Sequence, residues 1–304
     1  MNILLTGSSG LIGTELRSVL PPKHRVIRMV RSPQAGADEI YWDPSSGTLD
    51  TQALEGLDAV VNLAGENIAS GRWTAKKKRG IRESRIKGTQ LLSQTLSRLF
   101  DPPKVFVSVS ATGYYGNRGE EQLDEESDSG TGFLPQLCRE WEAATRAAVV
   151  RGIRVVIPRF GMVLSSKGGS LPLMLPVFRF GIGGRIGSGR QYMSWISIED
   201  IVGVIQYALD NEFLHGPVNA VSPNPVTNRE FTRTLASVLS KPAYLALPSF
   251  AARIALGEMA DEVLLASARV LPARLLEAGF RFQQPELEGA LRHTLQNRLE
   301  AVAT

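Results

Sequence analysis

The amino-acid sequence predicts an α/β fold with a doubly wound, mainly parallel sheet, followed by a smaller and mainly helical lobe. Up to about residue 160, short apolar runs alternate with segments in which apolar residues recur every three or four positions. This alternation is typical of a parallel sheet with helices on both faces. The alternation then breaks, because residues 165–189 are rich in Gly, Pro and Ser and the chain after Thr227 shows mostly helical spacing.

The predicted strands are short, mostly apolar runs. The first lies at residues 2–5 and leads into three glycines, Gly7, Gly10 and Gly13. Further strands are expected at residues 24–30, 57–63, 104–108, 154–157 and 218–221. Runs of four to eight apolar residues without alternation indicate strands that are buried on both faces.

The predicted helices carry an apolar stripe. Residues 11–20 have one from Leu11 to Leu20, residues 74–100 have one from Ile81 to Leu99, and residues 133–150 have one that includes Cys138 and Trp141. A helix that ends near Leu209 follows Ser197, which is a suitable N-cap with Asp200 three residues later as a weak capping box. The segment at residues 256–265 and a last helix after residue 285 complete the set.

Composition and charge exclude several functional classes. The 304 residues contain one cysteine, Cys138, and no apolar run of about eighteen residues, so we expect neither a disulfide framework nor a membrane partner. The start of the chain has no basic region before an apolar one, which favours a cytoplasmic protein. The net charge is +4, and the basic run at residues 76–79 is interpreted as a solvated helix face, since no nucleic-acid recognition motif accompanies it. The acidic loop at residues 117–132 has no calcium-loop spacing, and no metal site is expected.

The glycine turn predicts a dinucleotide-binding site of the Rossmann type. One glycine permits the sharp turn, a second lets backbone N–H groups approach a pyrophosphate, and a third lets the helix pack close to the strand. The start of the helix then faces the phosphates with its unpaired N–H groups. Glycines at this spacing also occur for turn geometry alone, but here they follow a strand, open a helix and precede a second strand.

Arginine at the end of the second strand favours NADP(H) over NAD(H). NAD-selective folds place a carboxylate there for the ribose hydroxyls, whereas this chain has Arg31. A guanidinium can bind a 2′-phosphate, although a surface arginine without this role remains an alternative. After the third strand, the small residues Ala64 and Gly65 would let the cofactor lie against bare backbone, and Arg85 could reach a phosphate or be solvated.

These features divide the chain into two parts. Residues 1–160, with residues 195–221 returning to them, are expected to form the NADP-binding domain. Residues 161–194 and 222–304 are expected to form a substrate and lid lobe, in which residues 165–189 are a long functional loop.

Several motifs together resemble one known family. They are Thr6-Gly7-x-x-Gly10-x-x-Gly13, the run from Asn62 to Ile68, Glu83-Ser84-Arg85, Tyr114-Tyr115, Trp141-Glu142, Gly187-Ser188-Gly189, Trp195-Ile196 and the run from Leu271 to Phe280. The chain resembles the atypical short-chain dehydrogenase/reductases of the SDR39U1-like epimerase family, over essentially its whole length. Members are often described as nucleoside-diphosphate-sugar epimerases or SulA-type cell-division inhibitors. The resemblance implies NADP(H) bound by Gly7, Gly10, Leu11, Ile12 and Gly13, with Arg31 at the 2′-phosphate and contacts from Leu63, Ala64, Gly65 and Arg85.

The chain departs from the superfamily where the proton chemistry is usually found. Active members use Tyr-x-x-x-Lys, and the match at Trp141-Glu142 places Leu134 and Cys138 at those two positions. Neither side chain can replace a tyrosine acid or the lysine that lowers its pKa. The usual Ser or Thr corresponds to Ser110 or to Ala111, depending on the register.

Two functions follow as hypotheses. In the first, the protein is an NADP(H)-dependent oxidoreductase or an epimerase-like enzyme with a small-molecule substrate. Tyr114 or Tyr115 would then carry the proton and Ser110 would orient the substrate, unless both tyrosines only pack under the lid. In the second, the protein is a non-catalytic NADP(H)-binding regulator, for example of cell division. The sequence leaves the oligomeric state open, with a homodimer as one option.

Overall fold

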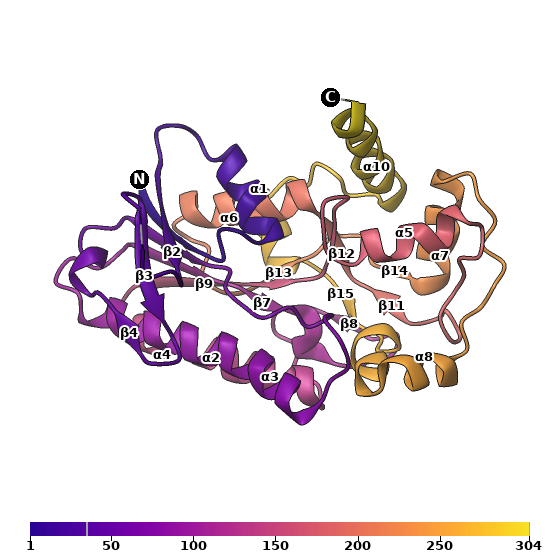
Figure 1. Ribbon diagram of the computed structural model, residues 1–304, viewed down its shortest axis with the longest axis horizontal. Coiled ribbons are helices and arrows are strands. Elements are labelled where there is room, and N and C mark those ends of the chain that lie inside the picture. The colour runs from indigo at the N-terminus through magenta and orange to yellow at the C-terminus, as the bar shows by residue number, and fades with distance from the viewer. Residues whose placement is uncertain (35, 304) are drawn as a thin grey trace.

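The computed structural model describes residues 1–34 and 36–303, and the side chains of those up to residue 296. A nine-stranded sheet lies at its centre, in the order β13-β9-β6-β5-β1-β2-β3-β4 with β7 beside β9 (Figure 1). The strands of this sheet are β1 (Asn2–Thr6), β2 (Arg25–Val30), β3 (Glu39–Asp43), β4 (Thr48–Leu49), β5 (Ala59–Asn62), β6 (Val105–Ser108), β7 (Ser110–Ala111), β9 (Arg154–Phe160) and β13 (Gly216–Ala220).

All neighbouring strands of the sheet are parallel except β3 and β4, which are antiparallel. The order runs outward in both directions from β1 and β5, which is the arrangement of a doubly wound nucleotide-binding sheet. This confirms the predicted fold class. Because parallel strands point the same way, the ends of β1, β2, β5 and β6 meet along one edge of the sheet.

Helices cover both faces of the sheet, which explains the continuous apolar runs in the strands. Ile3 and Leu5 of β1 belong to the apolar cluster under α1 (Leu11–Val19) and α6 (Ile198–Asp210). Leu4 belongs to the cluster on the other face, under α2 (Ala75–Arg98) and α4 (Arg146–Val150). Successive residues of a strand point to opposite faces, so a strand covered on both sides has to be apolar throughout.

Several elements of this part differ from the sequence-based prediction, among them the short strand β4, which was not predicted. The edge strand β3, whose Trp42 is buried on the face of α2, was not predicted because polar residues flank it. The helix expected at residues 133–150 is divided into α3 (Phe133–Ala143) and α4. The hydroxyl of Thr145 donates to the carbonyl of Glu142 at 2.7 Å, and such local hydrogen bonds compete with helix continuation.

The smaller lobe has its own apolar cluster. It includes Phe231 and Leu235 of α7 (Asn228–Val238), Leu291 of α10 (Leu287–Ala303) and Trp195 of β12 (Trp195–Ser197). The other elements of this region are β10 (Met162–Leu164), which pairs with β12, β11 (Tyr192–Met193), which pairs with β14 (Val226–Thr227), and α8 (Ser249–Leu256).

The predicted long loop at residues 165–189 is wrong in its centre, which forms α5 (Leu171–Arg179). Leu171, Leu175 and Phe178 are buried in the cluster of the smaller lobe at spacings of four and three residues. Proline at the second helical position is compatible with a helix start. The glycines on both sides of α5 led to the prediction of a loop, although the segment between them forms a short amphipathic helix.

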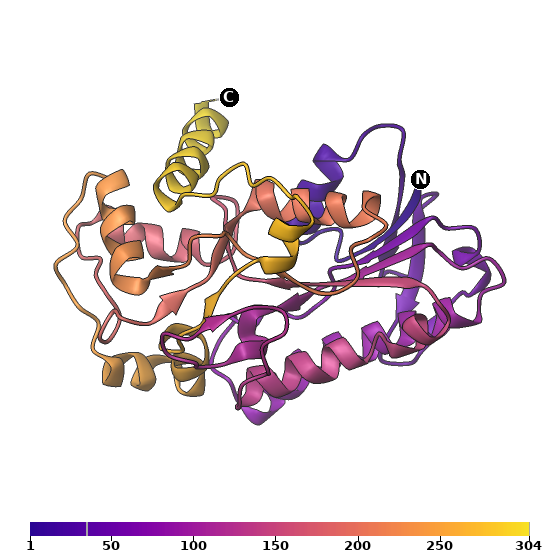
Figure 2. The same ribbon diagram turned by 180° about the vertical axis from the view of Figure 1, so that it is seen from behind.

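Part of the C-terminal segment packs beside the main sheet, and the predicted division of the chain at residue 222 stays a prediction. After a π-helical turn (Ala260–Leu264), β15 (Arg269–Val270) pairs with β8 (Gln122–Leu123). Next, α9 (Ala273–Glu277) packs on β13, and its Leu275 is buried in the cluster that contains α6. Tyr207 of α6 donates a hydrogen bond to the carbonyl of Ala278, and the view from behind shows α9 beside α6 (Figure 2).

Ser197 caps α6 as predicted, but Asp200 has another role. The Ser197 hydroxyl accepts from the Asp200 N–H at 3.0 Å. The Asp200 carboxylate accepts from the N–H groups of Gln283 and Gln284, at 2.6 and 3.0 Å, so it holds the returning segment instead of closing a capping box.

No helix within the described part of the chain is both long and apolar enough to cross a bilayer.

Candidate functional site

The turn between β1 and α1 requires glycine at two positions. A Cβ on Gly7, whose φ is +64°, would lie 2.8 Å from the carbonyl carbon of Leu63. A Cβ on Gly13 would lie 2.3 Å from the carbonyl oxygen of Gly7. Gly10 is less crowded, since its Cβ would meet only the Gly7 oxygen, at 3.2 Å. Gly7 and Gly13 therefore bring the turn, the helix and the end of β5 together, as the motif predicts.

The start of α1 remains available to an anion. Gly10 is the N-cap residue, and it provides no side-chain hydrogen bond to the helix. The first N–H groups, which belong to Leu11, Ile12 and Gly13, therefore point out of the helix end without a capping side chain. Such an end binds phosphate through its N–H groups and its positive dipole end, so this cradle fits a pyrophosphate.

A buried polar network fixes the loop after β5 beside this turn. The Thr6 hydroxyl donates to Asn62 Oδ1 at 2.7 Å and accepts from the N–H groups of Leu63 and Ala64, both at 3.1 Å. Asn62 Nδ2 in turn donates to Thr89 of α2 at 2.9 Å. Sequence analysis did not assign roles to Thr6 and Asn62, although polar residues at the ends of two buried strands were a usable signal.

Arg85 lies against the backbone of this loop. A Cβ on Gly65 would be 3.2 Å from Arg85 Cζ, and Arg85 Nη1 donates to the Ile81 carbonyl at 3.1 Å. The guanidinium also lies over the ring of Trp141, 5.1 Å from its centroid. Burial lowers the pKa of Arg85, and no described carboxylate forms an ion pair with it. A partly buried cation that has no carboxylate partner among the described residues fits a phosphate ligand.

Arg31 follows the end of β2 and is exposed. Because Thr6 pairs with Met29, Arg31 lies at the same edge of the sheet as the glycine turn. Arg28 is not equivalent to it, since Arg28 forms an ion pair with Glu39. Arg31 forms no ion pair with the residues that the structure describes, so its charge is available to a ligand.

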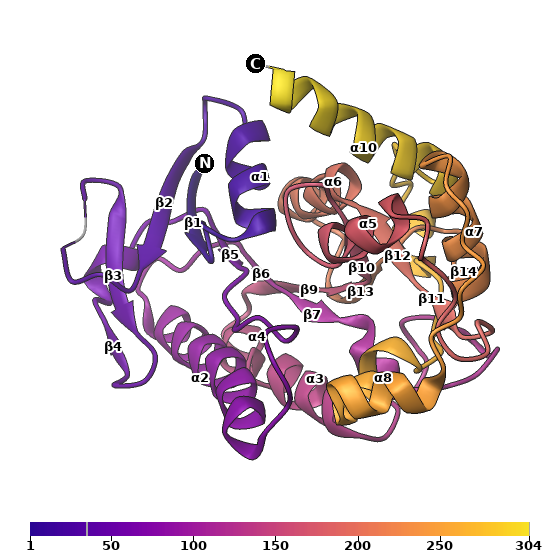
Figure 3. The ribbon, with the colours of Figure 1, turned by 45° about the vertical axis from the view of Figure 1, so that its right-hand side comes forward.

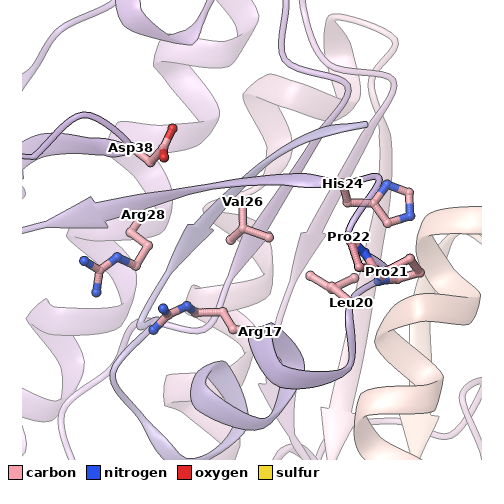
Figure 4. Close-up of a pocket in the computed structure, with 8 residues that line it drawn as sticks. All are labelled: Arg17, Leu20, Pro21, Pro22, His24, Val26, Arg28 and Asp38. Atoms are coloured by element: carbon pink, nitrogen blue, oxygen red, sulfur yellow. The ribbon is translucent and has the colours of Figure 1, made fainter.

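A pocket of about 440 Å³ lies at the other end of β2 and is not part of this site (Figure 4). Leu20, Pro21, Pro22 and His24 line it, at the end of α1 and the start of β2. In a parallel sheet this is the edge opposite the glycine turn. Its carboxylate, Asp38, pairs with Arg25 at 2.9 Å.

Leu134 and Cys138, which the predicted register matches to the tyrosine and lysine of the superfamily, both lie on α3. A Cβ on Gly113 would be 3.2 Å from Leu134 Cβ, and Cys138 Sγ lies 3.7 Å from the Ala111 carbonyl. This face of α3 therefore packs on the segment after β6. Burial raises the pKa of Cys138 to about 12, so the thiol is neutral at physiological pH. Neither residue can exchange a proton with a substrate.

A buried ion pair lies one helical turn further along α3. Glu142 receives two hydrogen bonds from Arg159 of β9, from Nε to Oε1 and from Nη2 to Oε2, both at 2.9 Å. The Ser110 hydroxyl donates to Glu142 Oε1 at 2.7 Å. Burial acts to lower the pKa of Arg159, but the hydrogen bonds and charge of Glu142 outweigh it and raise the pKa. Ser110, which is itself buried, is thus engaged by Glu142, an arrangement that does not favour the predicted contact with a substrate.

The two neighbouring tyrosines have different environments. Tyr115 is fully buried, and its hydroxyl accepts from Arg159 at 2.9 Å and lies 2.7 Å from Asn219 Oδ1. Burial raises the pKa of Tyr115 to about 12. Tyr114 is partly exposed, and its hydroxyl forms no hydrogen bond with the described residues. Arg159 Cζ lies over the Tyr114 ring, 3.5 Å from the ring centroid. Of the two predicted proton carriers, Tyr114 is therefore the more accessible one.

The basic run at the start of α2 is only in part the solvated face that the sequence suggested, because Lys76 and Arg79 are exposed but the two lysines between them form ion pairs. Lys77 pairs with Glu66 of the loop after β5 at 2.6 Å, and Lys78 pairs with Glu258 of the smaller lobe at 2.8 Å. Five residues from Lys77, Arg82 pairs with Glu140 of α3 at 2.6 Å. These pairs connect α2 to three segments around the site.

Glu262 connects the smaller lobe to the start of α3. Its carboxylate accepts from the N–H groups of Phe133 and Leu134, both at 3.1 Å. We expect Glu262→Ala to lower the free energy of unfolding by about 1 to 2 kcal/mol, because it removes the helix cap. Hydrogen exchange at Phe133 and Leu134 should become faster. Glu258→Ala is the matched control, since it breaks a more exposed pair worth about 0 to 1 kcal/mol. Equal effects of the two substitutions would contradict the capping role.

Comparison with known proteins gives the family. Residues 3–220 match the model of the NAD dependent epimerase/dehydratase family, and residues 247–294 match a domain of unknown function, DUF1731. Epimerase family protein ML0860 of Mycobacterium leprae is 47% identical over 290 residues, which cover 95% of this chain and 94% of that protein. Epimerase family protein YfhF of Bacillus subtilis is 38% identical over 304 residues, which cover 98% of this chain and 99% of that protein.

A solved structure agrees with these matches. The crystal structure of human epimerase family protein SDR39U1 with NADPH is 36% identical in sequence, with a TM-score of 0.88 over 98% of this chain and 100% of that chain. The present chain therefore belongs to the NAD dependent epimerase/dehydratase family, as one of its SDR39U1-like members.

Proposed function

We propose that the protein binds NADP(H) and uses it in an oxidation or reduction of a small carbonyl or alcohol substrate, either as a net reaction or within an epimerisation. The observation that carries this proposal is the uncapped start of α1, with Arg85 and Arg31 at the same edge of the sheet. Among the residues described after β2, no carboxylate is free to bind the ribose hydroxyls. The acidic residues that follow β2, Asp38 and Glu39, pair with Arg25 and Arg28. The related human protein with NADPH supports the same cofactor.

Different residues of the chain would bind the cofactor, exclude water and carry the proton. NADP(H), when bound, supplies or accepts the hydride. The N–H groups at the start of α1 and the Arg85 guanidinium bind phosphate, and Arg31 binds the 2′-phosphate. Leu134 and Cys138 form an apolar wall that excludes water. The Tyr114 hydroxyl holds the proton at the substrate oxygen, below the permanent charge of Arg159.

Substitution of Arg31 tests whether the protein prefers NADPH to NADH. We expect Arg31→Ala to weaken NADPH binding by roughly 10- to 100-fold, since a charge-assisted hydrogen bond is worth about 1.5 to 3 kcal/mol. NADH binding should stay unchanged, because NADH has no 2′-phosphate. Titration calorimetry with both nucleotides measures this difference, and Arg25→Ala is the control on the same strand. If the affinities for NADPH and NADH fall equally, Arg31 does not bind the 2′-phosphate.

Tyr114 tests the chemistry. Wild-type protein is mixed with NADPH and a panel of aldehydes and ketones, and the loss of nicotinamide absorbance is followed. We expect Tyr114→Phe to keep NADPH affinity and to lower the rate by about 10²- to 10⁴-fold, which is the usual contribution of a positioned acid. A variant that turns over as fast as the wild type would remove Tyr114 as the proton carrier.

A non-catalytic NADP(H)-binding regulator is the second candidate. What favours it is that Leu134 and Cys138, which the predicted register matches to the proton-handling positions, are both buried and cannot exchange a proton. Tight NADPH binding without oxidation of NADPH by any carbonyl compound in the panel would support this candidate over the enzyme.

A further inference from the structure

The end of the smaller lobe exposes an unusual number of large apolar side chains. We call this surface the lobe patch, and it consists of Phe180, Ile182, Tyr244, Leu245, Phe250 and Ile254. Their exposed fractions range from 54% for Ile182 to 92% for Tyr244. Scattered exposed apolar residues are normal, but a contiguous group of this size marks an interaction surface in a soluble protein.

Contacts between two loops bring the segments that carry the lobe patch together. Gly181 packs on Pro242, where a Cβ would lie 3.2 Å from the proline ring, and the Gly184 backbone packs directly on Leu245. The N–H of Gly187 donates to the Leu247 carbonyl at 2.8 Å, two residues before α8 begins. Figure 3 shows these loops running beside each other from α5 and α7 down to α8. Phe250 and Ile254 are four residues apart on α8 and therefore share one face of it.

The charge around the lobe patch is almost entirely positive. Residues 161–194 and 222–257 contain four Lys or Arg residues each, against a single acidic residue, Glu230. The Glu230 carboxylate is engaged in the capping box of α7. Next to the patch, Arg179 and Lys241 are exposed and form no ion pair among the described residues. The net charge of the whole chain is only +4, so the positive charge is concentrated in these two segments. Beyond them, Glu258 and Asp261 pair with Lys78 and Arg253.

This combination favours a lipid surface over other partners. Anionic headgroups attract the cations, and aromatic and aliphatic side chains at loop tips insert between headgroups. A symmetric dimer through the lobe patch would bring two positively charged surfaces together, because a two-fold interface joins the same patch on both copies. Nucleic acid would leave the aliphatic side chains without a role.

We propose that the lobe patch docks the protein on the surface of an anionic phospholipid membrane. Phe180, Tyr244 and Phe250 enter the headgroup layer, and Arg179 and Lys241 contact lipid phosphates. This revises the expectation of no membrane partner, which rested on the absence of a long apolar run. The proposal is independent of the cofactor, so it can fail without affecting the proposed function.

Vesicle sedimentation of the full chain tests the proposal. We expect the protein to sediment with vesicles of equal parts phosphatidylcholine and phosphatidylglycerol, and not with phosphatidylcholine alone. High salt should release it, because exposed charges are screened. The double substitution F180S/Y244S should weaken binding more than tenfold, since burying one such side chain is worth about 1.5 to 3 kcal/mol. Lys241→Glu should also weaken it.

A matched control separates lipid docking from non-specific adsorption. Phe213, which follows α6 outside the lobe patch, is 92% exposed, and F213S should bind vesicles like the wild type. All these substitutions are at exposed positions, so circular dichroism and NADPH binding should be unchanged. No sedimentation with anionic vesicles would overturn the proposal. An equal loss of vesicle binding in F213S would also overturn it. So would self-association of the wild type in the assay, if F180S/Y244S abolishes that self-association.

Discussion

Glu142→Ala should lower the free energy of unfolding by about 3 to 5 kcal/mol, because it leaves a buried charge without its partner. The side chain of Arg159 is only 3% exposed and that of Glu142 is 11% exposed. Without the carboxylate, the Arg159 charge remains buried with only the hydroxyl of Tyr115 and the ring faces of the two tyrosines beside it. Denaturant unfolding of the two proteins measures the difference.

Two further variants show whether burial is the cause. Glu140 lies on α3, as Glu142 does, and forms a more exposed ion pair with Arg82 of α2. We expect Glu140→Ala to lower the free energy of unfolding by at most about 1 kcal/mol. The double variant E142L/R159M removes both charges and should recover much of the lost stability, because a buried ion pair can be replaced by apolar groups at little cost. A double variant that is as unstable as Glu142→Ala would show that an uncompensated charge is not the reason.

Gly13→Ala should lower the free energy of unfolding by about 2 to 3 kcal/mol and abolish NADPH binding. The added Cβ would lie 2.3 Å from the Gly7 oxygen and 2.8 Å from Ser8 Cα, and both are backbone atoms that no rotamer change can move away. The helix has to shift away from the turn, which costs packing energy of the kind seen on overfilling a core. Replacing glycine by alanine inside a helix ordinarily stabilises a protein by about 1 kcal/mol. A decrease in the free energy of unfolding would therefore point to the steric contact.

Gly10→Ala is the control for this prediction. Its Cβ would meet only the Gly7 oxygen, at 3.2 Å, so the fold should change in stability by less than about 1 kcal/mol. Thermal unfolding and NADPH titration of both variants measure the two effects. If Gly13→Ala is as stable as the wild type, the close contact between helix and turn is not needed for folding.

The main sheet could be predicted from the sequence because its determinants are local. A strand buried on both faces is a short apolar run, a covering helix carries a stripe, and a nucleotide turn has glycines at fixed positions. The predictions failed where a local pattern was weak. The short strand β3 has polar neighbours, and glycines surround α5 on both sides.

The chemistry of the site could be predicted only in part, since it depends on residues far apart in the chain. Sequence analysis proposed Tyr114 and Tyr115 equally, and no local signal separated them. Their difference comes from Arg159, which is 44 residues away from Tyr115 and contacts its hydroxyl. Glu142 was noted only as part of a family motif, and its bond to Ser110 spans 32 residues. Such contacts follow from strand order and helix packing, which periodicity does not give.

The apolar cluster around Trp73 has a consequence for how the chain folds. Trp73 and Ile81, from the region around the start of α2, pack with Leu137 of α3 and with Met259, which lies just beyond α8. A truncated chain that ended before α8 would leave this cluster open to water and would lose the anchors at Glu258 and Glu262. We therefore expect the nucleotide-binding sheet and the C-terminal segment to unfold together as one cooperative unit, so that neither could be exchanged between proteins without the other.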